Sequence, residues 1–132
     1  MADTLQFDLV SPERKVASIE ATQVQIPGMT GDFTAMPNHA PFLTTLRPGV
    51  VRVIAGSDAT EYVVTGGFAE ISPTSATILA EQAVPRGEAG SEMIAALVAE
   101  AESARAEAPE DTRQLADQRL RDVTSLKSTL SL

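Results

Sequence analysis

The residues that could perform chemistry gather in one segment, residues 28–49. This segment holds His39, the only histidine of the chain, with Asp32 as the nearest carboxylate and hydroxyl groups at Thr44 and Thr45. Histidine titrates near neutral pH, so His39 could act as a general base with Asp32 as its acidic partner. The same histidine could make a structural hydrogen bond or lie at a protein interface, and these three interpretations remain open.

No motif of a known active-site class accompanies these residues. Gly28-Met-Thr-Gly31 lacks the Gly-Lys-Ser/Thr that completes a phosphate-binding loop, and the chain contains neither a nucleophile elbow nor a histidine pair. It also contains no cysteine, which excludes disulfides, thiolate metal sites and cysteine nucleophiles. We therefore expect a protein that is not an enzyme and that has no metal site or cofactor of its own.

Charge and composition exclude several kinds of partner. The net charge is −8, whereas nucleic acids are bound through Lys and Arg, so we expect no nucleic-acid binding. Adsorption to an anionic membrane surface is disfavoured for the same reason. No apolar run approaches the roughly 20 residues of a membrane-spanning helix, and the N-terminus has no signal-peptide pattern. We expect a soluble protein that reaches a membrane only through a partner.

Strands must hold the segment 28–49, because its glycines and prolines exclude a helix. Short alternating or β-branched runs recur up to Pro85 and are separated by turn residues. Their spacing predicts an antiparallel sandwich or barrel with one buried face for each sheet. Gly66-Gly67 predicts a point where two backbones approach closely, and Arg47 and Arg52 are expected to be surface charges. The runs are residues 5–10, 19–26, 50–54, 61–65, 68–71 and 75–80.

The composition changes at Pro85-Arg86-Gly87, beyond which the chain is rich in alanine. Apolar residues then recur at helical spacing, with Ser91 as a plausible N-cap and Pro109 between two helices, where it could open the second. The pattern predicts a β domain over residues 1–86 and an antiparallel two-helix hairpin over residues 87–132. The predicted stripes are Ile94, Leu97, Val98, Ala101 and Ala104 in the first helix, and Ala116, Leu120, Val123, Leu126 and Leu130 in the second.

Four sequence blocks occur in order along the β region. They read Leu9-Val-Ser-Pro-Glu13, Ile26-Pro-Gly-Met-Thr-Gly-Asp-Phe33, Pro37-Asn-His-Ala-Pro-Phe-Leu-Thr-Thr-Leu-Arg-Pro-Gly49 and Gly66-Gly-Phe-Ala-Glu-Ile71. Together they closely resemble the epsilon subunits of bacterial F-type ATP synthases, whose mitochondrial homologue is called delta. The resemblance implies a mainly β protein with an α part: a ten-stranded antiparallel sandwich of two five-stranded sheets, followed by a two-helix hairpin.

The resemblance also implies a non-catalytic rotor subunit of the central stalk that couples proton flow to ATP synthesis. Such a subunit binds gamma, rests on the c-ring and reaches the alpha and beta subunits through its hairpin. Its place is the cytoplasmic face of the bacterial inner membrane, as a peripheral part of the complex. The family's c-ring loop matches Gly31-Asp32-Phe33, with the turn at Met36, Asn38 and His39 beside it, and Asp32 would face polar or basic groups on the c subunits.

The C-terminal region departs from the family pattern. Many relatives begin the first helix with Ile/Leu-Asp-x-x-Arg-Ala, which binds ATP in some of them. Gly90, Ser91 and Ile94 stand here at the positions of the apolar residue, the carboxylate and the arginine, so we expect no bound nucleotide. The first helix is acidic where inhibitory relatives are basic, which implies at most weak regulation of hydrolysis by the hairpin.

Two functions of other classes stay open beside the rotor subunit. One is a stand-alone β-sandwich module whose segment 28–49 recognises a small ligand or a peptide. The other is a small enzyme that uses His39 and Asp32. The binding module would not co-purify with a gamma subunit. The enzyme would lose all activity on His39→Ala, whereas a docking subunit should lose coupling or assembly only in part.

Overall fold

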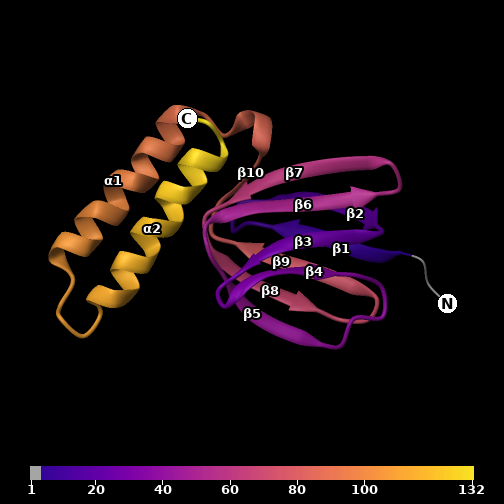
Figure 1. Ribbon diagram of the computed structural model, residues 1–132. Coiled ribbons are helices and arrows are strands. Elements are labelled where there is room, and N and C mark those ends of the chain that lie inside the picture. The colour runs from indigo at the N-terminus through magenta and orange to yellow at the C-terminus, as the bar shows by residue number, and fades with distance from the viewer. Residues whose placement is uncertain (1–3) are drawn as a thin grey trace. The chain divides into compact units, whose positions relative to one another are not determined.

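Ten strands and two α-helices follow one another along residues 4–132, which are the residues that the computed structural model describes (Figure 1). The strands form one compact unit that ends at Arg86, and the helices form a second that begins at Gly87. The strands are β1 (Leu5–Val10), β2 (Lys15–Ala21), β3 (Gln23–Gly28), β4 (Gly31–Ala35), β5 (Phe42–Leu46), β6 (Gly49–Ala55), β7 (Asp58–Val64), β8 (Gly67–Ile71), β9 (Ser75–Ala80) and β10 (Ala83–Pro85).

The strands are hydrogen-bonded into one ten-stranded sheet of the order β10-β7-β6-β3-β5-β8-β9-β1-β2, with β4 paired to β3 off this path, and this sheet folds into a sandwich. One half of the sandwich contains β10-β7-β6-β3-β4 and the other contains β5-β8-β9-β1-β2. A single pair, Gly28 with Leu46, joins β3 to β5 and brings the sandwich close to a barrel. The ten-stranded sandwich that the resemblance implies is therefore confirmed. One detail differs from the expectation, because β1 pairs parallel with β9 while the other described strand pairs are antiparallel.

The prediction of a single strand over residues 19–26 is wrong. Ile19 lies in β2, Thr22 lies between strands, and β3 begins at Gln23. The Thr22 amide and hydroxyl both donate to the carbonyl of Ile54, at 2.7 and 2.8 Å. Thr22 thus anchors the passage from one sheet to the other, which local alternation cannot reveal because both flanking strands are apolar on one face.

The core consists of the inward-facing residues of both sheets. Leu5, Phe7 and Leu9 of β1 are buried, and the residues between them point outward. The Phe7 ring stacks on Tyr62, with centroids 6.2 Å apart, and burial raises the pKa of the Tyr62 phenol. Aliphatic side chains fill the rest, including Val24, Ile26, Val51, Val53, Ile71 and Ile78.

The predicted close approach of two backbones at Gly66-Gly67 is confirmed. Gly67 has φ +131°, and a Cβ atom there would lie 2.0 Å from the carbonyl oxygen of Leu79. The Gly66 carbonyl accepts the Glu81 amide at 3.0 Å. Only glycine satisfies both the backbone angle and the space at position 67.

The second unit is a helical hairpin made of α1 (Ser91–Glu107) and α2 (Arg113–Thr129), after a short 3-10 turn, η1 (Arg86–Glu88). The helices run antiparallel side by side (Figure 1). Arg105 Nε lies 2.5 Å from Asp117 Oδ1 and links them. Both predicted stripes contribute buried residues, although Ala104 is exposed; the buried members are Ile94, Leu97, Ala101, Val123 and Leu126.

The predicted N-cap of the first helix is wrong by one residue, and the predicted start of the second helix is wrong by four. Gly90, not Ser91, is the N-cap of α1, and its carbonyl accepts the Ile94 amide at 3.2 Å without any side-chain cap. Pro109 does not open α2, because the Thr112 amide returns to the Pro109 carbonyl at 3.1 Å and closes a turn. The second helix therefore begins only at Arg113.

Candidate functional site

The β3–β4 hairpin carries the first group of candidate residues. Gly28 pairs with Gly31 across the hairpin, and Gly31 takes φ +143°, a conformation that favours glycine. Beyond the turn, Asp32 stands opposite Pro27 on β3. Because side chains alternate along a strand, Asp32 and Phe33 point to opposite faces of β4. The loop expected from the resemblance is thus split into a charged outer face and an aromatic inner face.

Asp32 is held by an arginine that the sequence predicts only as a surface charge. Arg47 Nη2 makes an ion pair with Asp32 Oδ1, and Arg47 Nε donates to the Gly28 carbonyl at 2.8 Å. The Asp32 side chain remains 78% exposed, whereas that of Arg47 is 28% exposed. The sequence carries no local signal for this contact, because it depends on the pairing of β3 with β5.

His39 lies in an aromatic cluster and not beside Asp32. Its ring centroid is 6.5 Å from that of Phe33, and the Phe33 ring meets Phe42 edge-on at 5.3 Å. The His39 Nδ1 atom lies 2.6 Å from the carbonyl oxygen of Ala40. Asp32 makes its ion pair with Arg47 instead, so the acid–base pair that an enzyme would require is not formed.

The turn from Met36 to His39 is held at the other end of β4. The His39 amide donates to the Met36 carbonyl at 3.1 Å, and Asn38 takes φ 70°. A proline followed by a residue with positive φ is typical of a type II turn, and asparagine tolerates that angle better than most residues. The Asn38 amide also donates to the Pro73 carbonyl at 2.8 Å.

The six candidate residues therefore form two groups and not one patch. Gly31 and Asp32 lie at the start of β4, whereas Met36, Asn38 and His39 follow its end, with Phe33 turned towards the second group. The length of the strand separates the two groups by roughly 13 Å. A flat partner could touch both, but only Asp32 presents a charge.

An exposed apolar surface lies on the outer face of the β5-β8-β9-β1-β2 sheet and was not predicted. Leu43, Phe68 and Leu79 are 69%, 52% and 49% exposed. Phe68 pairs with Leu79, and Leu79 pairs with Val10, so they continue across three strands. We call Val10, Leu43, Phe68 and Leu79 the apolar strip. Outward-facing strand positions are normally polar in a sheet that has one buried face. Apolar residues at such positions are the sequence signal that could have revealed this surface.

A groove of 340 Å³ runs along part of the apolar strip. Its lining is mostly apolar, and it opens between the end of β1 and the start of β8. Exposed apolar patches on a protein surface commonly mark sites of protein–protein contact. The groove residues are Val10, Ser11, Pro12, Gly67, Phe68, Leu79, Ala80 and Glu81.

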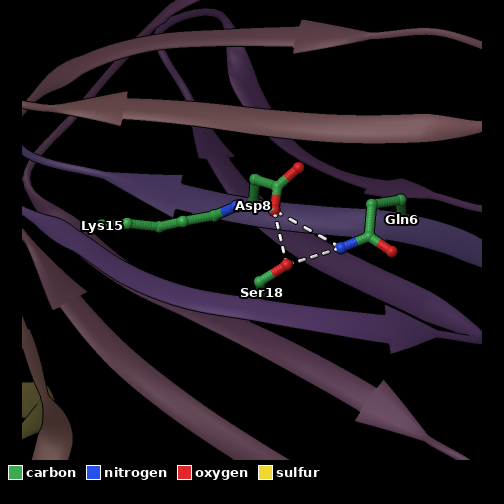
Figure 2. Close-up of polar contacts among 4 residues, drawn as sticks. All are labelled: Gln6, Asp8, Lys15 and Ser18. Carbon is green, nitrogen blue, oxygen red and sulfur yellow. Dashed lines mark hydrogen bonds and ion pairs between the residues drawn. The ribbon is translucent and has the colours of Figure 1, made fainter.

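The same sheet face is polar on β1 and β2, where four side chains converge (Figure 2). Ser18 donates to Asp8 Oδ1 at 2.8 Å, Gln6 donates to Ser18 Oγ at 2.7 Å, and Lys15 Nζ lies 3.3 Å from Asp8. The Ser18 hydrogen bond is the largest cause that holds the pKa of Asp8 below its ordinary value of 3.8, and Gln6 and Lys15 act in the same direction. The four side chains thus provide one another with partners.

Asp8→Asn is expected to remove part of the acid sensitivity of the sandwich. Since the pKa of Asp8 is lower in the folded than in the unfolded state, its ionised form stabilises the fold above its unfolded pKa. That stability is lost as the pH falls through the folded pKa. The variant should lose about 1 kcal/mol or less at pH 7, as for an exposed ion pair, and less than that near pH 2. Urea unfolding at both pH values measures this. Equal losses of unfolding free energy at the two pH values would contradict this prediction. Ser18→Ala should act in the same direction as Asp8→Asn.

The three residues at the specified positions of the nucleotide motif that the resemblance implies carry no charged group. Gly90 caps α1, Ser91 is its exposed first residue, and Ile94 is buried. No group of three or more potential metal ligands occurs among residues 4–132. Within the same range, none of the helices has the length and apolar character needed to cross a membrane.

Comparison with protein families gives one match for the β-sandwich. Residues 4–86 match the family described as ATP synthase, Delta/Epsilon chain, beta-sandwich domain. The ATP synthase epsilon chain of Rhodobacter capsulatus is 46% identical over 132 residues, and the match covers the whole of both chains. ATP synthase epsilon chain 1 of Cereibacter sphaeroides is 52% identical over 130 residues, or 98% of each chain.

Two solved structures share the fold. A chain of the Euglena gracilis mitochondrial ATP synthase, determined as OSCP/F1/c-ring, superposes with a TM-score of 0.76 at 22% identity, covering 98% of this chain and 83% of that one. A chain of the Tetrahymena thermophila mitochondrial ATP synthase, from a structure of the central stalk and c-ring, gives 0.63 at 11% identity, with coverage of 92% and 94%. At these identities the superpositions show the fold alone.

Proposed function

This chain belongs to the delta/epsilon family of ATP synthase subunits, and on that premise we propose how its exposed surfaces act in the enzyme. The family resemblance of the four sequence blocks is confirmed. The chain is an epsilon subunit of the F-type ATP synthase central stalk, and it is not catalytic. A subunit without chemistry of its own must act through contacts, so its exposed residues are where its function lies.

We propose that the β3–β4 hairpin rests on the c-ring. The observation that carries this assignment is Asp32, a 78% exposed carboxylate at the start of β4 whose position is fixed by Arg47. A groove of 180 Å³ beside Asp32, lined also by Gln25 and Thr34, offers polar groups to a partner side chain. Polar or basic groups on the loops of the c subunits would complement this surface. Met36, Asn38 and His39 form its second contact, at the far end of β4.

The apolar strip is the proposed contact with gamma. Leu43, Phe68 and Leu79 present large side chains to solvent from adjoining strands. Burying such side chains favours association by about 1.5–3 kcal/mol each when they are fully covered. The subunit would then bind gamma through one sheet face and the c-ring through its β3–β4 hairpin. It would transmit rotation between proton flow and ATP synthesis. Through these partners it is held at the cytoplasmic face of the bacterial inner membrane.

The helical hairpin is proposed to contact the alpha and beta subunits without strong inhibition. Its first helix exposes Glu92, Glu100, Glu102 and Glu107. Because the facing segments of beta in inhibitory relatives are acidic, like charges disfavour an extended, inhibitory hairpin. The motif positions Gly90, Ser91 and Ile94 also lack the charged groups that hold ATP in some relatives.

Asp32→Lys is expected to weaken coupling while leaving the isolated subunit folded. Reversal of the charge facing the c-ring should lower ATP-driven proton pumping per ATP hydrolysed by about tenfold. This is the effect of weakening the contact between the β3–β4 hairpin and the c-ring by about 1.4 kcal/mol. Charges as exposed as Asp32 contribute little to folding, so the unfolding midpoint should shift little. Proton pumping and hydrolysis in inverted membrane vesicles measure the ratio.

The matched control is Asp58→Lys, which reverses an exposed carboxylate at the start of another strand, β7, directly after the turn that follows β6. It should keep the coupling of the unmodified enzyme. If Asp32→Lys and Asp58→Lys give the same pumping ratio, Asp32 does not lie at the c-ring contact.

A further inference from the structure

Arg47 connects the β3–β4 hairpin to the segment between β5 and β6. Its Nε donates to the Gly28 carbonyl at 2.8 Å, its Nη2 pairs with Asp32, and its own amide donates to the Pro27 carbonyl at 3.0 Å. The Met29 amide adds a further link, to the Thr45 carbonyl at 2.9 Å. The hairpin is therefore bound on both its strands and its turn by one short stretch of chain.

Glycines allow close packing at two places, one within the hairpin and one where the hairpin meets the segment after β5. Within the hairpin, a Cβ atom on Gly28 would lie 2.7 Å from the Gly31 carbonyl oxygen and 3.1 Å from the Phe33 ring. A Cβ atom on Gly49 would lie 2.8 Å from the Cβ of Pro27. The hairpin thus lies against the segment 47–49 without room for a further side chain, and the arginine reaches both of its targets.

We propose that Arg47 is the positioning residue of the coupling surface: it fixes the direction of the Asp32 carboxylate and of the β3–β4 turn. This inference rests on the proposed c-ring contact. A guanidinium carries several donors in a rigid planar fork, so one side chain can hold a carbonyl and a carboxylate in a set geometry. Lysine has the charge but presents a single, flexible ammonium group.

The exposure of the Arg47–Asp32 ion pair indicates that it positions the hairpin more than it stabilises the fold. The Arg47 and Asp32 side chains are 28% and 78% exposed, and ion pairs so exposed contribute little to folding. Their geometric effect is larger, because force applied to Asp32 by a rotating partner passes through Arg47 into the backbone of β3 and of the segment after β5. Loss of Arg47 should therefore loosen the hairpin before it unfolds the sandwich.

The first test measures the hairpin in the isolated full-length subunit. In Arg47→Gln, amide hydrogen exchange of Met29, followed by NMR, should become about tenfold faster, while the amide of Ile78 in the core keeps its rate. Arg52→Gln, which removes an exposed positive charge from β6 of the same sheet, is the control and should change neither rate. Unchanged exchange at Met29 in Arg47→Gln overturns the inference.

The second test measures coupling in the assembled enzyme. Arg47→Gln should lower proton pumping per ATP hydrolysed to the level of Asp32→Asn, and the double variant should lose no more than either single one. Arg47→Lys should recover less than half of the loss, because it restores charge without the fork. Full recovery by lysine, or additive losses in the double variant, overturns the positioning role.

The two tests separate this inference from the proposed function. If Met29 exchange rises in Arg47→Gln but neither this variant nor Asp32→Asn changes coupling, Arg47 holds the hairpin but the proposed c-ring contact is wrong, and the positioning role fails with it. If Asp32→Asn lowers coupling and Arg47→Gln does not, the contact stands and the positioning role alone is overturned.

Discussion

Gly67→Ala is expected to lower the free energy of unfolding of the β-sandwich by about 4 kcal/mol, from roughly 1–3 kcal/mol of overpacking and roughly 1–3 kcal/mol of backbone strain. The added methyl group would stand 2.0 Å from the Leu79 carbonyl oxygen and 2.9 Å from the Cα of Ala80. Neither atom can move alone, because both belong to the β8–β9 ladder. A domain of this size has about 5–15 kcal/mol of stability in total, so a large part would be lost.

Substitutions at two other glycines separate the contribution of backbone strain from that of overpacking. Gly56 has φ +64° with no atom within 4 Å of an added Cβ, so Gly56→Ala tests backbone strain alone. Gly87 has neither positive φ nor a close neighbour, and Gly87→Ala should be nearly neutral. Urea unfolding of the three full-length variants, followed by circular dichroism, ranks them. Equal losses for Gly67→Ala and Gly56→Ala would mean that β8 and β9 are not packed as closely as described.

Phe68→Glu is expected to weaken binding to gamma by at least about 100-fold, the effect of losing about 2.7 kcal/mol. In the proposed complex it replaces a large apolar contact by a carboxylate that must lose its water without gaining a partner. Residues of this kind at the centre of an interface commonly dominate its binding energy. Titration of purified gamma into the subunit by calorimetry measures the dissociation constant.

Folding should not be the reason for that loss. Phe68 is 52% exposed, and substitutions at such positions usually change stability little. Leu115, on α2, is 72% exposed and lies outside the apolar strip. Leu115→Glu is therefore the matched control and should bind gamma like the unmodified subunit. Tight binding by Phe68→Glu would place gamma on another surface.

The fold was largely predictable because its signals are local. Alternation around Leu5, Phe7 and Leu9 indicates a strand with one buried face, and the alanine-rich stretch after Gly87 indicates helices. The ends of elements were less predictable. Gly90 caps α1 because its backbone is extended, with φ −86° and ψ 168°, and no residue type specifies these angles. Pro109 could equally open a helix or close a turn.

The candidate site was less predictable than the fold because its contacts are distant in sequence. Asp32 and His39 are near neighbours along the chain, yet one pairs with Arg47 and the other lies against Phe33. The apolar strip includes Val10, Phe68 and Leu79, which become adjacent only once β1, β8 and β9 have paired. Strand order across two sheets is a global property, and no local pattern contains it.

The parallel pairing of β1 with β9 has a consequence for the order in which the protein is made. Phe7 is paired with Ala76, so β1 must wait for a strand that the ribosome adds much later. At about 5–20 residues per second, that delay is on the order of 10 s, during which β1 has only β2 beside it. The helical hairpin needs only contacts close in sequence and can form as soon as it emerges. The pairing of β1 with β9 is thus a late step, and a nascent chain stopped before β9 leaves one edge of β1 without its strand.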